Sequence, residues 1–415
     1  MSSIAPKAGT KIAVMWMAIT IASVGASAIL TAASLADSVS RAARKAEILL
    51  AGAPDRGIFD PSIAGDGRQL YMTVSGVSST AAGSSLGVTA VRSYLAGSQD
   101  QGRTWQFVGG VVNPDVEASL DDFPSPHRGR WQSEVTALAF DRDAPQSARW
   151  KLFWHQYLNV NGERRFEHGW LAYKEAETPE QLASARPVKL ITARGYDRVN
   201  DQSAGRTKSP LAGPAVIRIH ELNRGLARCA AVSEPGVLAK PDALYLALIC
   251  FRGSLFGLFG VSNQVVLLKC RRPCDATRPE GWSYAGTVLS QRDAEALGMG
   301  KLSAADLFAH DGHSFVVVSP VGTVPGQGAY KGCAVFPFED LATGAITRDR
   351  DGRPQLAAFV ELDKDSFNGA CAFLPDGPHR GLVIGQVDFA ARRDGIEPTF
   401  RIFATEVMPA NVERQ

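Results

Sequence analysis

The stretch that decides the fold is "SQDQGRTWQFVGGVV", residues 98–112. The spacing S-x-D-x-G-x-T-W is typical of a tight hairpin turn, because Asp100 can accept hydrogen bonds from backbone amides two residues on and Gly102 can adopt a positive φ. Trp105 then begins a strand and can pack back over the turn. Residues 281–289, "GWSYAGTVL", repeat the pattern W-x-aromatic-x-G-x-V of that strand. The sequence therefore predicts repeated β units that end in the same kind of strand.

Outward from this repeat, apolar segments with period-two alternation recur along the chain, and long helical periodicity is nearly absent. They fall into five groups, which begin near Phe59, Ser133, Val232, Ala304 and Phe367. Radial repetition of four-stranded units gives a β-propeller, so we predict an all-β, five-bladed β-propeller over residues 55–410. An irregular β-sandwich is the alternative. Residues 192–228 are predicted as a long loop between the second and third blades.

The composition fits a globular protein with a large core. The chain has 415 residues, of which 45% are hydrophobic, and its 40 glycines and 23 prolines favour turns over long helices. Lys plus Arg number 44 and Asp plus Glu number 42. This balance lacks the basic character of a nucleic-acid-binding protein, so no nucleic-acid partner is expected.

The N-terminus differs from the rest of the chain. Lys7 and Lys11 precede an apolar run over residues 12–24, and small residues continue to Ala36. Residues 1–36 are therefore predicted to be a secretory signal peptide or a membrane-anchor helix. Residues 37–54 are predicted as a linker, with a short polar helix over 38–52. The basic flank places the following domain in the periplasm or outside the cell, either free or anchored to the cytoplasmic membrane.

Six cysteines form an even set, which favours disulfides in an exported chain. Their spacing does not resemble a zinc site, and histidine is scarce nearby. Cys229 and Cys250 flank neighbouring predicted strands, and "CRRPC" can close a small loop between Cys270 and Cys274. Cys333 and Cys371 then make the third pair.

A ring of polar residues opens the five strand groups. They are Asp60 in "IFDPSI", Glu134 in "WQSEVTAL", Glu234 in "AVSEPGVL", Asp306 in "SAADLFAH" and Asn368 in "SFNGACAF". The innermost strand of each propeller blade lines the central channel, so we expect these residues at equivalent positions around one acidic pocket. Each one singly is also consistent with an ordinary strand-edge residue. No cofactor is expected, although such oxygen ligands also suit a structural calcium ion in the channel.

Three of these phrases, "FDPSI", "WQSEV" and "SEPGV", resemble those of five-bladed glycosidases of the arabinanase, xylosidase and fructosidase type. Their order and blade assignment agree over most of residues 55–410. Two departures are that Glu134 stands where the family has aspartate, and that proline and glycine are exchanged after Glu234. Separately, "SQDQGRTW" resembles the Asp box of sialidase-type propellers, which marks a fold rather than a chemistry.

The resemblance implies a role for each of the three acids in an inverting glycoside hydrolase. Asp60 would be the base and Glu234 the proton donor. Glu134 would lie close to Glu234 and keep it protonated near neutral pH by like-charge repulsion.

Three further residues are predicted to bind substrate. Trp131 is expected either to stack on a sugar face or to fill the core between blades. Asp306 and Asn368 are expected to hydrogen-bond sugar hydroxyls from the far side of the mouth. A sialidase would instead need three arginines and a tyrosine paired with a glutamate, for which the candidates are Arg56, Arg252 and Tyr330.

The function expected first is hydrolysis of an extracytoplasmic oligo- or polysaccharide, so carbohydrate is the expected partner. The alternative is a non-catalytic propeller that binds a glycan or a protein at the cell envelope. A third interpretation gives the acids only a structural role. An open acidic pocket lined by tryptophan would favour the first, and an ion pair on any of the three acids would favour the second.

Overall fold

The computed structural model describes residues 46–78, 90–112, 117–120, 127–160, 163–196, 211, 213–252, 262–322, 330–362, 367–388 and 399–410. The chain divides into two compact units, Met1–Ser38 and Val39–Gln415. The predicted signal or anchor segment lies outside the described residues, and every element named below belongs to the second unit. None of the helices in the described ranges is long and apolar enough to cross a membrane.

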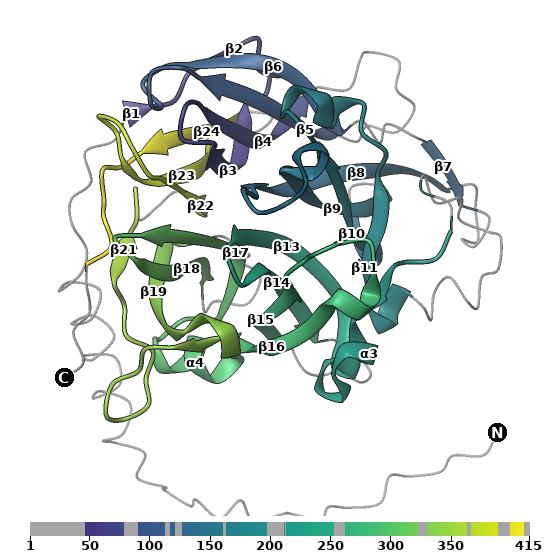
Figure 1. Ribbon diagram of the computed structural model, residues 1–415, viewed down its shortest axis with the longest axis vertical. Helices are drawn as coiled ribbons and strands as arrows, with labels where there is room; N and C mark the ends of the chain where they lie inside the picture. The colour runs from purple at the N-terminus through teal and green to yellow at the C-terminus, as the bar shows by residue number, and fades with distance from the viewer. Residues whose placement is uncertain are drawn as a thin grey trace, which may run out of the picture. The chain divides into compact units, whose positions relative to one another are not determined.

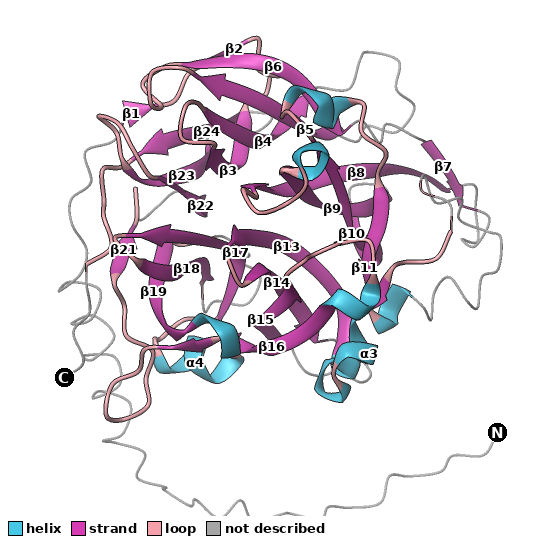
Figure 2. Cartoon of the chain, in the orientation of Figure 1, coloured by secondary structure: helices cyan, strands magenta, loops and turns pink. Residues whose placement is uncertain are grey.

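The described strands form five sheets, one for each predicted group, arranged around a common axis (Figure 1). Strands dominate, and the short helices α3 (Ile219–Leu222) and α4 (Gln291–Ala296) lie at the periphery (Figure 2). The architecture is therefore a five-bladed β-propeller, as the sequence predicts.

Three blades come from the first part of the chain. Blade 1 contains β3 (Ile58–Gly65), β4 (Leu70–Ser78), β5 (Ala90–Ser98), β6 (Trp105–Val112) and, at its outer edge, β2 (Leu50–Ala51). Blade 2 contains β8 (His127–Phe140), β9 (Trp150–Val160), β10 (Glu163–Ala176) and β11 (Val188–Thr192), with β7 (Glu117–Leu120) and β12 (Ile217–Arg218) at its two edges. Blade 3 contains β13 (Cys229–Ala239), β14 (Ala243–Arg252), β15 (Ser262–Arg271) and β16 (Trp282–Leu289).

The remaining two blades close the ring. Blade 4 contains β17 (Lys301–His310), β18 (His313–Val321) and β19 (Cys333–Asp340), with β20 (Ala345–Ile346) and β21 (Ala358–Val360) both paired to β19. Blade 5 contains β22 (Phe367–Leu374), β23 (Gly381–Asp388), β24 (Thr399–Ala404) and β1 (Ala46–Glu47). The first strand of each blade contacts that of the next, and β22 contacts β3.

Both ends of the propeller unit meet in blade 5, where Ala46 of β1 pairs with Ala404 of β24. The helix predicted over 38–52 is therefore wrong for its described part, because this part contains the short strands β1 and β2 and no helix. Leu50 is buried and Leu49 is 74% exposed, an alternation that suits a strand at a sheet edge. Pairing with β24 and β6 outweighs the local helical propensity of this segment.

Each inner strand is interrupted by a one-residue β-bulge. In every blade the bulge contains a residue with a left-handed backbone, at φ between 49° and 53°: Asp60, Val135, Glu234, Ala304 and Ala370. A bulge adds a residue to one strand and redirects the side chains that follow it. The bulges therefore define which positions are equivalent around the axis.

The hairpin turn between β5 and β6 has the hydrogen bonds of a side-chain-stabilised turn. The backbone N–H of Thr104 donates to Asp100 at 2.8 Å, so the bonded amide lies four residues after Asp100 and not two as the sequence predicted. The Trp105 indole N–H donates to the carbonyl of Gly102 at 3.1 Å. Gly102 has a φ of 82°, as expected. The turn is thus held by its own side chains.

All three predicted disulfides are present. Cys229–Cys250 and Cys270–Cys274 lie within blade 3, whereas Cys333–Cys371 connects β19 of blade 4 to β22 of blade 5. The buried apolar side chains of the described residues form five clusters, each between two neighbouring blades. The core is therefore distributed around the ring and leaves the axis for polar groups.

Candidate active site

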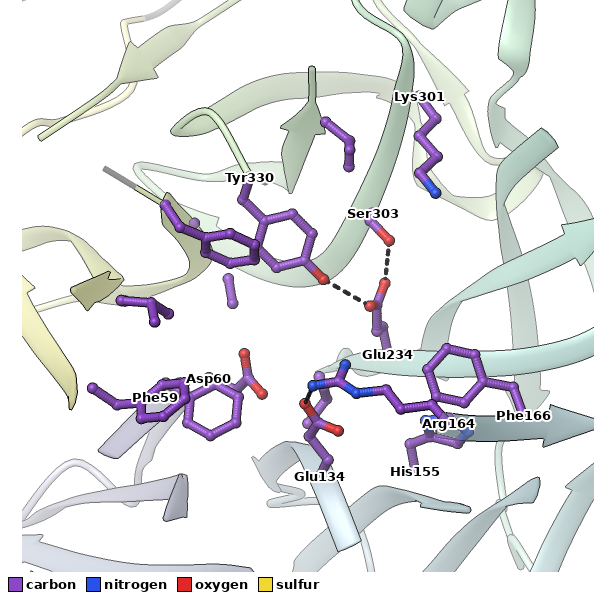
Figure 3. A pocket seen from close by; sticks show the side chains of 18 of the residues that line it. Phe59, Asp60, Glu134, His155, Arg164, Phe166, Glu234, Lys301, Ser303 and Tyr330 are labelled. Carbon is purple, nitrogen blue, oxygen red and sulfur yellow. Dashed lines mark hydrogen bonds and ion pairs between the residues drawn. The ribbon is translucent and has the colours of Figure 1, made fainter. Parts of the chain in front are cut away.

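A cavity of about 410 Å³ opens at the propeller axis. Every blade contributes to its wall. The lining residues are Phe59, Asp60, Glu134, Val135, His155, Arg164, Phe166, Glu234, Phe251, Lys301, Ser303, Val321, Tyr330, Phe367, Gly369, Ala370, Gly385, Val387 and Phe400. The structure thus brings Asp60, Glu134 and Glu234, from three different blades, to one cavity (Figure 3).

Asp60 lies at the bulge of β3 and is 5% exposed. The Ser75 side chain hydrogen-bonds its carboxyl group, but Oδ2 is buried and has no hydrogen-bond partner among the described residues. Burial, and then the negative charges of Glu134 and Glu234, raise the pKa of Asp60 well above its usual range. The ionised form of Asp60 is therefore disfavoured in this cavity.

Glu234 occupies the equivalent bulge position in β13 and has the opposite surroundings. Its Oε2 accepts hydrogen bonds from the Ser303 hydroxyl and from the Ala304 backbone N–H, both at 2.6 Å. Its Oε1 accepts a hydrogen bond from the Tyr330 hydroxyl at 2.9 Å. Both oxygens of Glu234 thus act as acceptors.

Glu134 forms an ion pair. Its Oε1 lies 3.3 Å from Nη2 of Arg164, and its Oε2 accepts a hydrogen bond from the Tyr157 hydroxyl. Arg164 remains protonated, because the charge of Glu134 raises its pKa. The side chain of Arg164 is 54% exposed and its guanidinium group points into the cavity (Figure 3). The negative charge of Glu134 is therefore paired with a cation at the edge of the cavity.

Most of the remaining wall is aromatic. Three ring pairs bridge neighbouring parts of the propeller: Phe59 with Phe400 at 4.8 Å between centroids, Phe166 with Phe251 at 5.5 Å, and Tyr330 with Phe367 at 4.9 Å. Nearby, His155 is buried against Phe166, and burial together with the charge of Arg164 lowers its pKa to about 3. His155 is therefore neutral at physiological pH.

Trp131 does not line the cavity. It is 2% exposed and packs in the core between blades 1 and 2, with its ring 4.9 Å from that of Trp170. The sugar-stacking interpretation is therefore wrong, and the core alternative holds.

Asp306 and Asn368 are also absent from the wall of this cavity. Asp306 lines a much smaller adjacent cavity together with Asp60, and burial raises its pKa to about 8 although it accepts a hydrogen bond from the Leu307 N–H. Asn368 is fully buried, and its Oδ1 accepts a hydrogen bond from the Leu362 N–H. Their expected contacts with sugar hydroxyls in the larger cavity are not supported.

The bulges explain this error. Only Asp60 and Glu234 of the five predicted ring residues occupy the left-handed bulge position. Glu134 precedes that position by one residue, Asp306 follows it by two and Asn368 precedes it by two. A bulge adds a residue and redirects the side chains around it, so residues at different distances from the bulge do not occupy equivalent positions, although Glu134 still lines the cavity. The prediction of five equivalent positions is therefore wrong for these three residues.

The structure adds two residues, Tyr330 and Arg164, to the candidate site. Of the sialidase candidates, Tyr330 lines the cavity, whereas Arg56 and Arg252 do not. Arg164 was not predicted; the sequence signal that could have found it is the hairpin dipeptide Asn161–Gly162, which places it at the tip of a hairpin. Within the described ranges, no group of three or more His, Cys, Asp or Glu side chains is arranged to hold a metal ion.

No protein-family model matches the sequence, and no curated protein is detectably similar to it. Several solved structures are similar in fold. A thermostable family-43 glycoside hydrolase shares 13% identity, with 88% of this chain and 97% of that chain covered and a TM-score of 0.45. The Bacillus subtilis arabinanase shares 14% identity, with 87% and 99% covered and a TM-score of 0.44. The Bombyx mori family-32 β-fructofuranosidase, in a sucrose complex, shares 11% identity, with 90% of this chain but 65% of that chain covered and a TM-score of 0.45.

Proposed function

We propose that this protein is a glycoside hydrolase whose reaction centre is the carboxyl pair Asp60 and Glu234. Glycoside cleavage requires one protonated carboxyl group at the leaving oxygen and one carboxylate at the opposite side of the sugar. The observation that carries the proposal is that Asp60 and Glu234 face one cavity in opposite environments. Asp60 has a raised pKa and a buried oxygen without a partner among the described residues, whereas Glu234 accepts three hydrogen bonds.

The cavity also suits a carbohydrate in size and surface. Its volume of about 410 Å³ lies within the usual range for small-molecule sites. The aromatic rings offer flat surfaces for the C–H faces of a sugar, while the Lys301 ammonium and the Arg164 guanidinium offer donors for its hydroxyl groups. An oligosaccharide end of a polysaccharide, or a small glycoside, is the proposed substrate class.

We place the proposed reaction outside the cytoplasm. Three disulfides favour an oxidising compartment, and the basic, apolar N-terminal sequence resembles an export signal or anchor. The periplasm or the extracellular space satisfies both features, with the protein either free or attached to the cytoplasmic membrane.

The second candidate function is non-catalytic glycan binding. The ion pair between Arg164 and Glu134 favours it, as does the lack of tryptophan among the described residues of the wall. In the described part of the chain, however, neither Asp60 nor Glu234 has an ion-pair partner within 4 Å. The two groups that a hydrolase needs therefore remain available for chemistry, and hydrolysis is the function that we favour.

The test is turnover on a panel of nitrophenyl arabinofuranosides, xylosides and fructosides and their oligosaccharides. On the oligosaccharides, whose leaving oxygen needs protonation, Asp60→Asn and Glu234→Gln should each lower kcat/KM by about 10²- to 10⁴-fold, because each removes one half of the acid–base pair. Asp306→Asn is the matched control, since it changes a half-buried acid outside the larger cavity and should leave activity near that of the wild type.

Two outcomes would count against hydrolysis. Unchanged activity of Glu234→Gln would remove the proposed carboxyl pair. Absence of turnover on the whole panel, together with saturable oligosaccharide binding by calorimetry, would establish the non-catalytic alternative. Circular dichroism of each variant separates lost chemistry from lost folding.

A further inference from the structure

We infer that Tyr330 is a positioning residue that holds Glu234 as the base of the carboxyl pair, so that Asp60 is the proton donor. The inference rests on the proposed function and specifies the direction of proton transfer. It assigns the two acids the reverse of the roles that the family resemblance implies.

The first argument is the hydrogen bonding of Glu234. Three donors converge on it: the hydroxyls of Ser303 and Tyr330, which Figure 3 shows, and the backbone N–H of Ala304. Donors that surround a carboxylate favour its ionised form, which accepts a proton and does not donate one. Tyr330 stays protonated, because burial and the charge of Glu234 raise its pKa well above the usual value. The Tyr330 hydroxyl therefore keeps its proton and donates it in the hydrogen bond to Oε1 of Glu234.

The second argument is that the fold makes room for Tyr330 at this place. A Cβ at Gly369 would lie 2.6 Å from Cβ of Tyr330, so only glycine allows the tyrosine to sit there. The ring packs against Phe367 of β22, and the carbonyl of Tyr330 accepts a hydrogen bond from the Asn368 N–H at 3.2 Å. Tyr330 is therefore fixed to blade 5 and reaches across to blade 3.

The third argument concerns Asp60. Two carboxyl groups that share one site cannot both be ionised without a large repulsion, so the proton belongs to the group with the poorer hydrogen bonding. Asp60 has a buried Oδ2 without a partner among the described residues. The other titratable groups around Glu234 on the cavity wall are Glu134 of β8, His155 of β9, Arg164 of β10 and Lys301 of β17. Of these, Glu134 is paired with Arg164, which leaves Asp60 as the proton carrier.

The resulting step balances. The Asp60 proton passes to the glycosidic oxygen as its bond to the anomeric carbon breaks. Glu234 takes a proton from water while the water oxygen bonds to that carbon, which gives a hemiacetal and a free hydroxyl. Asp60 then ends ionised and Glu234 protonated, and solvent restores the starting state. Direct attack by water predicts inversion at the anomeric carbon.

The experiment compares two leaving groups on the panel sugar that the wild type hydrolyses, a methyl glycoside and a 2,4-dinitrophenyl glycoside. Asp60→Asn should lose activity on the methyl glycoside and retain most of it on the dinitrophenyl glycoside, which needs no protonation. Glu234→Gln should lose activity equally on both. Tyr330→Phe should lower kcat/KM about tenfold to a hundredfold on both, since it weakens one hydrogen bond to a charged group.

The pH–rate profile separates a positioning role from a merely structural one. Tyr330→Phe should move the acid limb to higher pH, because the ionised base has lost one donor. Tyr245→Phe is the matched control: its hydroxyl also donates to a carboxylate, that of Asp242 in blade 3, away from the cavity. This control should leave both the rate and the profile unchanged.

Three results would overturn the inference while leaving the proposed hydrolase intact. The first is a wild-type profile for Tyr330→Phe. The second is an activated leaving group that rescues Glu234→Gln but not Asp60→Asn, which would restore the roles implied by the resemblance. The third is retention of anomeric configuration with a glycosyl adduct on Tyr330 in mass spectra, which would make the tyrosine a nucleophile.

Discussion

Asp60 illustrates how one residue combines strain, burial and charge at the proposed site. Its backbone adopts a φ of 49°, a region that a non-glycine residue occupies only when the surrounding structure imposes it. Its carboxyl group is buried beside two other acids, and one of its oxygens has no hydrogen-bond partner in the described ranges. Such a position opposes folding, and a site that needs a protonated acid gives a reason to retain it.

Asp60→Asn should therefore stabilise the fold at neutral pH. The folded pKa of Asp60 lies above the unfolded value, so its contribution is fully present below about pH 4 and is lost as pH rises toward the folded pKa. We expect equal melting temperatures for wild type and variant near pH 4, and a melting temperature about 1–3 °C higher for the variant at pH 7. Calorimetry across this pH range measures the difference.

Asp100 serves as the control for Asp60, because its pKa is shifted in the opposite direction. Its hydrogen bonds from the Thr104 hydroxyl and N–H lower its pKa to about 2. Its contribution is present above the unfolded pKa and is lost as pH falls toward 2. The melting temperature of Asp100→Asn should therefore be lower than that of the wild type at pH 7, and the two should converge at acidic pH.

For Asp60→Asn, a melting temperature below that of the wild type at neutral pH would contradict the prediction. It would show that Asp60 is ionised in the folded protein.

At the scale of the element, the inner-strand bulge is the device that builds the site. It presents Asp60 from β3 and Glu234 from β13 at equivalent positions. The bulge of blade 3 also packs closely on that of blade 4: a Cβ at Gly236 would lie 2.4 Å from Cα of Asp306 and 2.7 Å from the carbonyl oxygen of Ala305. Glycine at 236 thus lets two neighbouring inner strands touch.

Gly236→Ala should destabilise the protein by about 1–3 kcal/mol, because the atoms in the way are backbone and cannot rotate aside. Urea unfolding measures the change. The matched control is Gly110→Ala in β6, where an added Cβ meets nothing within 4 Å. A loss at Gly236 no greater than at Gly110 would mean that the inner strands tolerate separation.

At the scale of the whole molecule, two features hold the ring closed at blade 5. One is the pairing of β1 with β24, which joins the start of the propeller to its end. The other is the Cys333–Cys371 disulfide, which joins blade 4 to blade 5 next to the bulge residue Ala370. The cavity depends on this closure because its wall draws residues from every blade.

Removal of this bond as Cys333→Ala/Cys371→Ala should lower the free energy of unfolding by about 3–4 kcal/mol, as expected for a cross-link that spans 38 residues. Urea unfolding of the oxidised protein measures it. Cys229→Ala/Cys250→Ala is the comparison, since that bond lies within blade 3. If ring closure holds the site, only the first double variant should also lower glycosidase activity at temperatures well below melting.

The sequence by itself determined the five strand groups, the three cysteine pairs and the acids Asp60 and Glu234. The strand groups, the two cysteine pairs of blade 3 and the two acids are encoded locally, in side-chain alternation, turn residues and short phrases that each lie within one strand or hairpin. The third pair, Cys333–Cys371, follows because these are the two cysteines that remain. Only the tertiary structure decided the register of Asp306 and Asn368, because a one-residue bulge leaves no clear mark on the apolar pattern.

Tertiary structure alone also decided the electrostatics of the site. Arg164 is 30 residues from Glu134, and Tyr330 is 96 residues from Glu234. The local sequence around Arg164 and Tyr330 does not indicate that they contact these acids. Which carboxyl group holds the proton depends on burial and on donors supplied by other blades, and these exist only after the ring has closed.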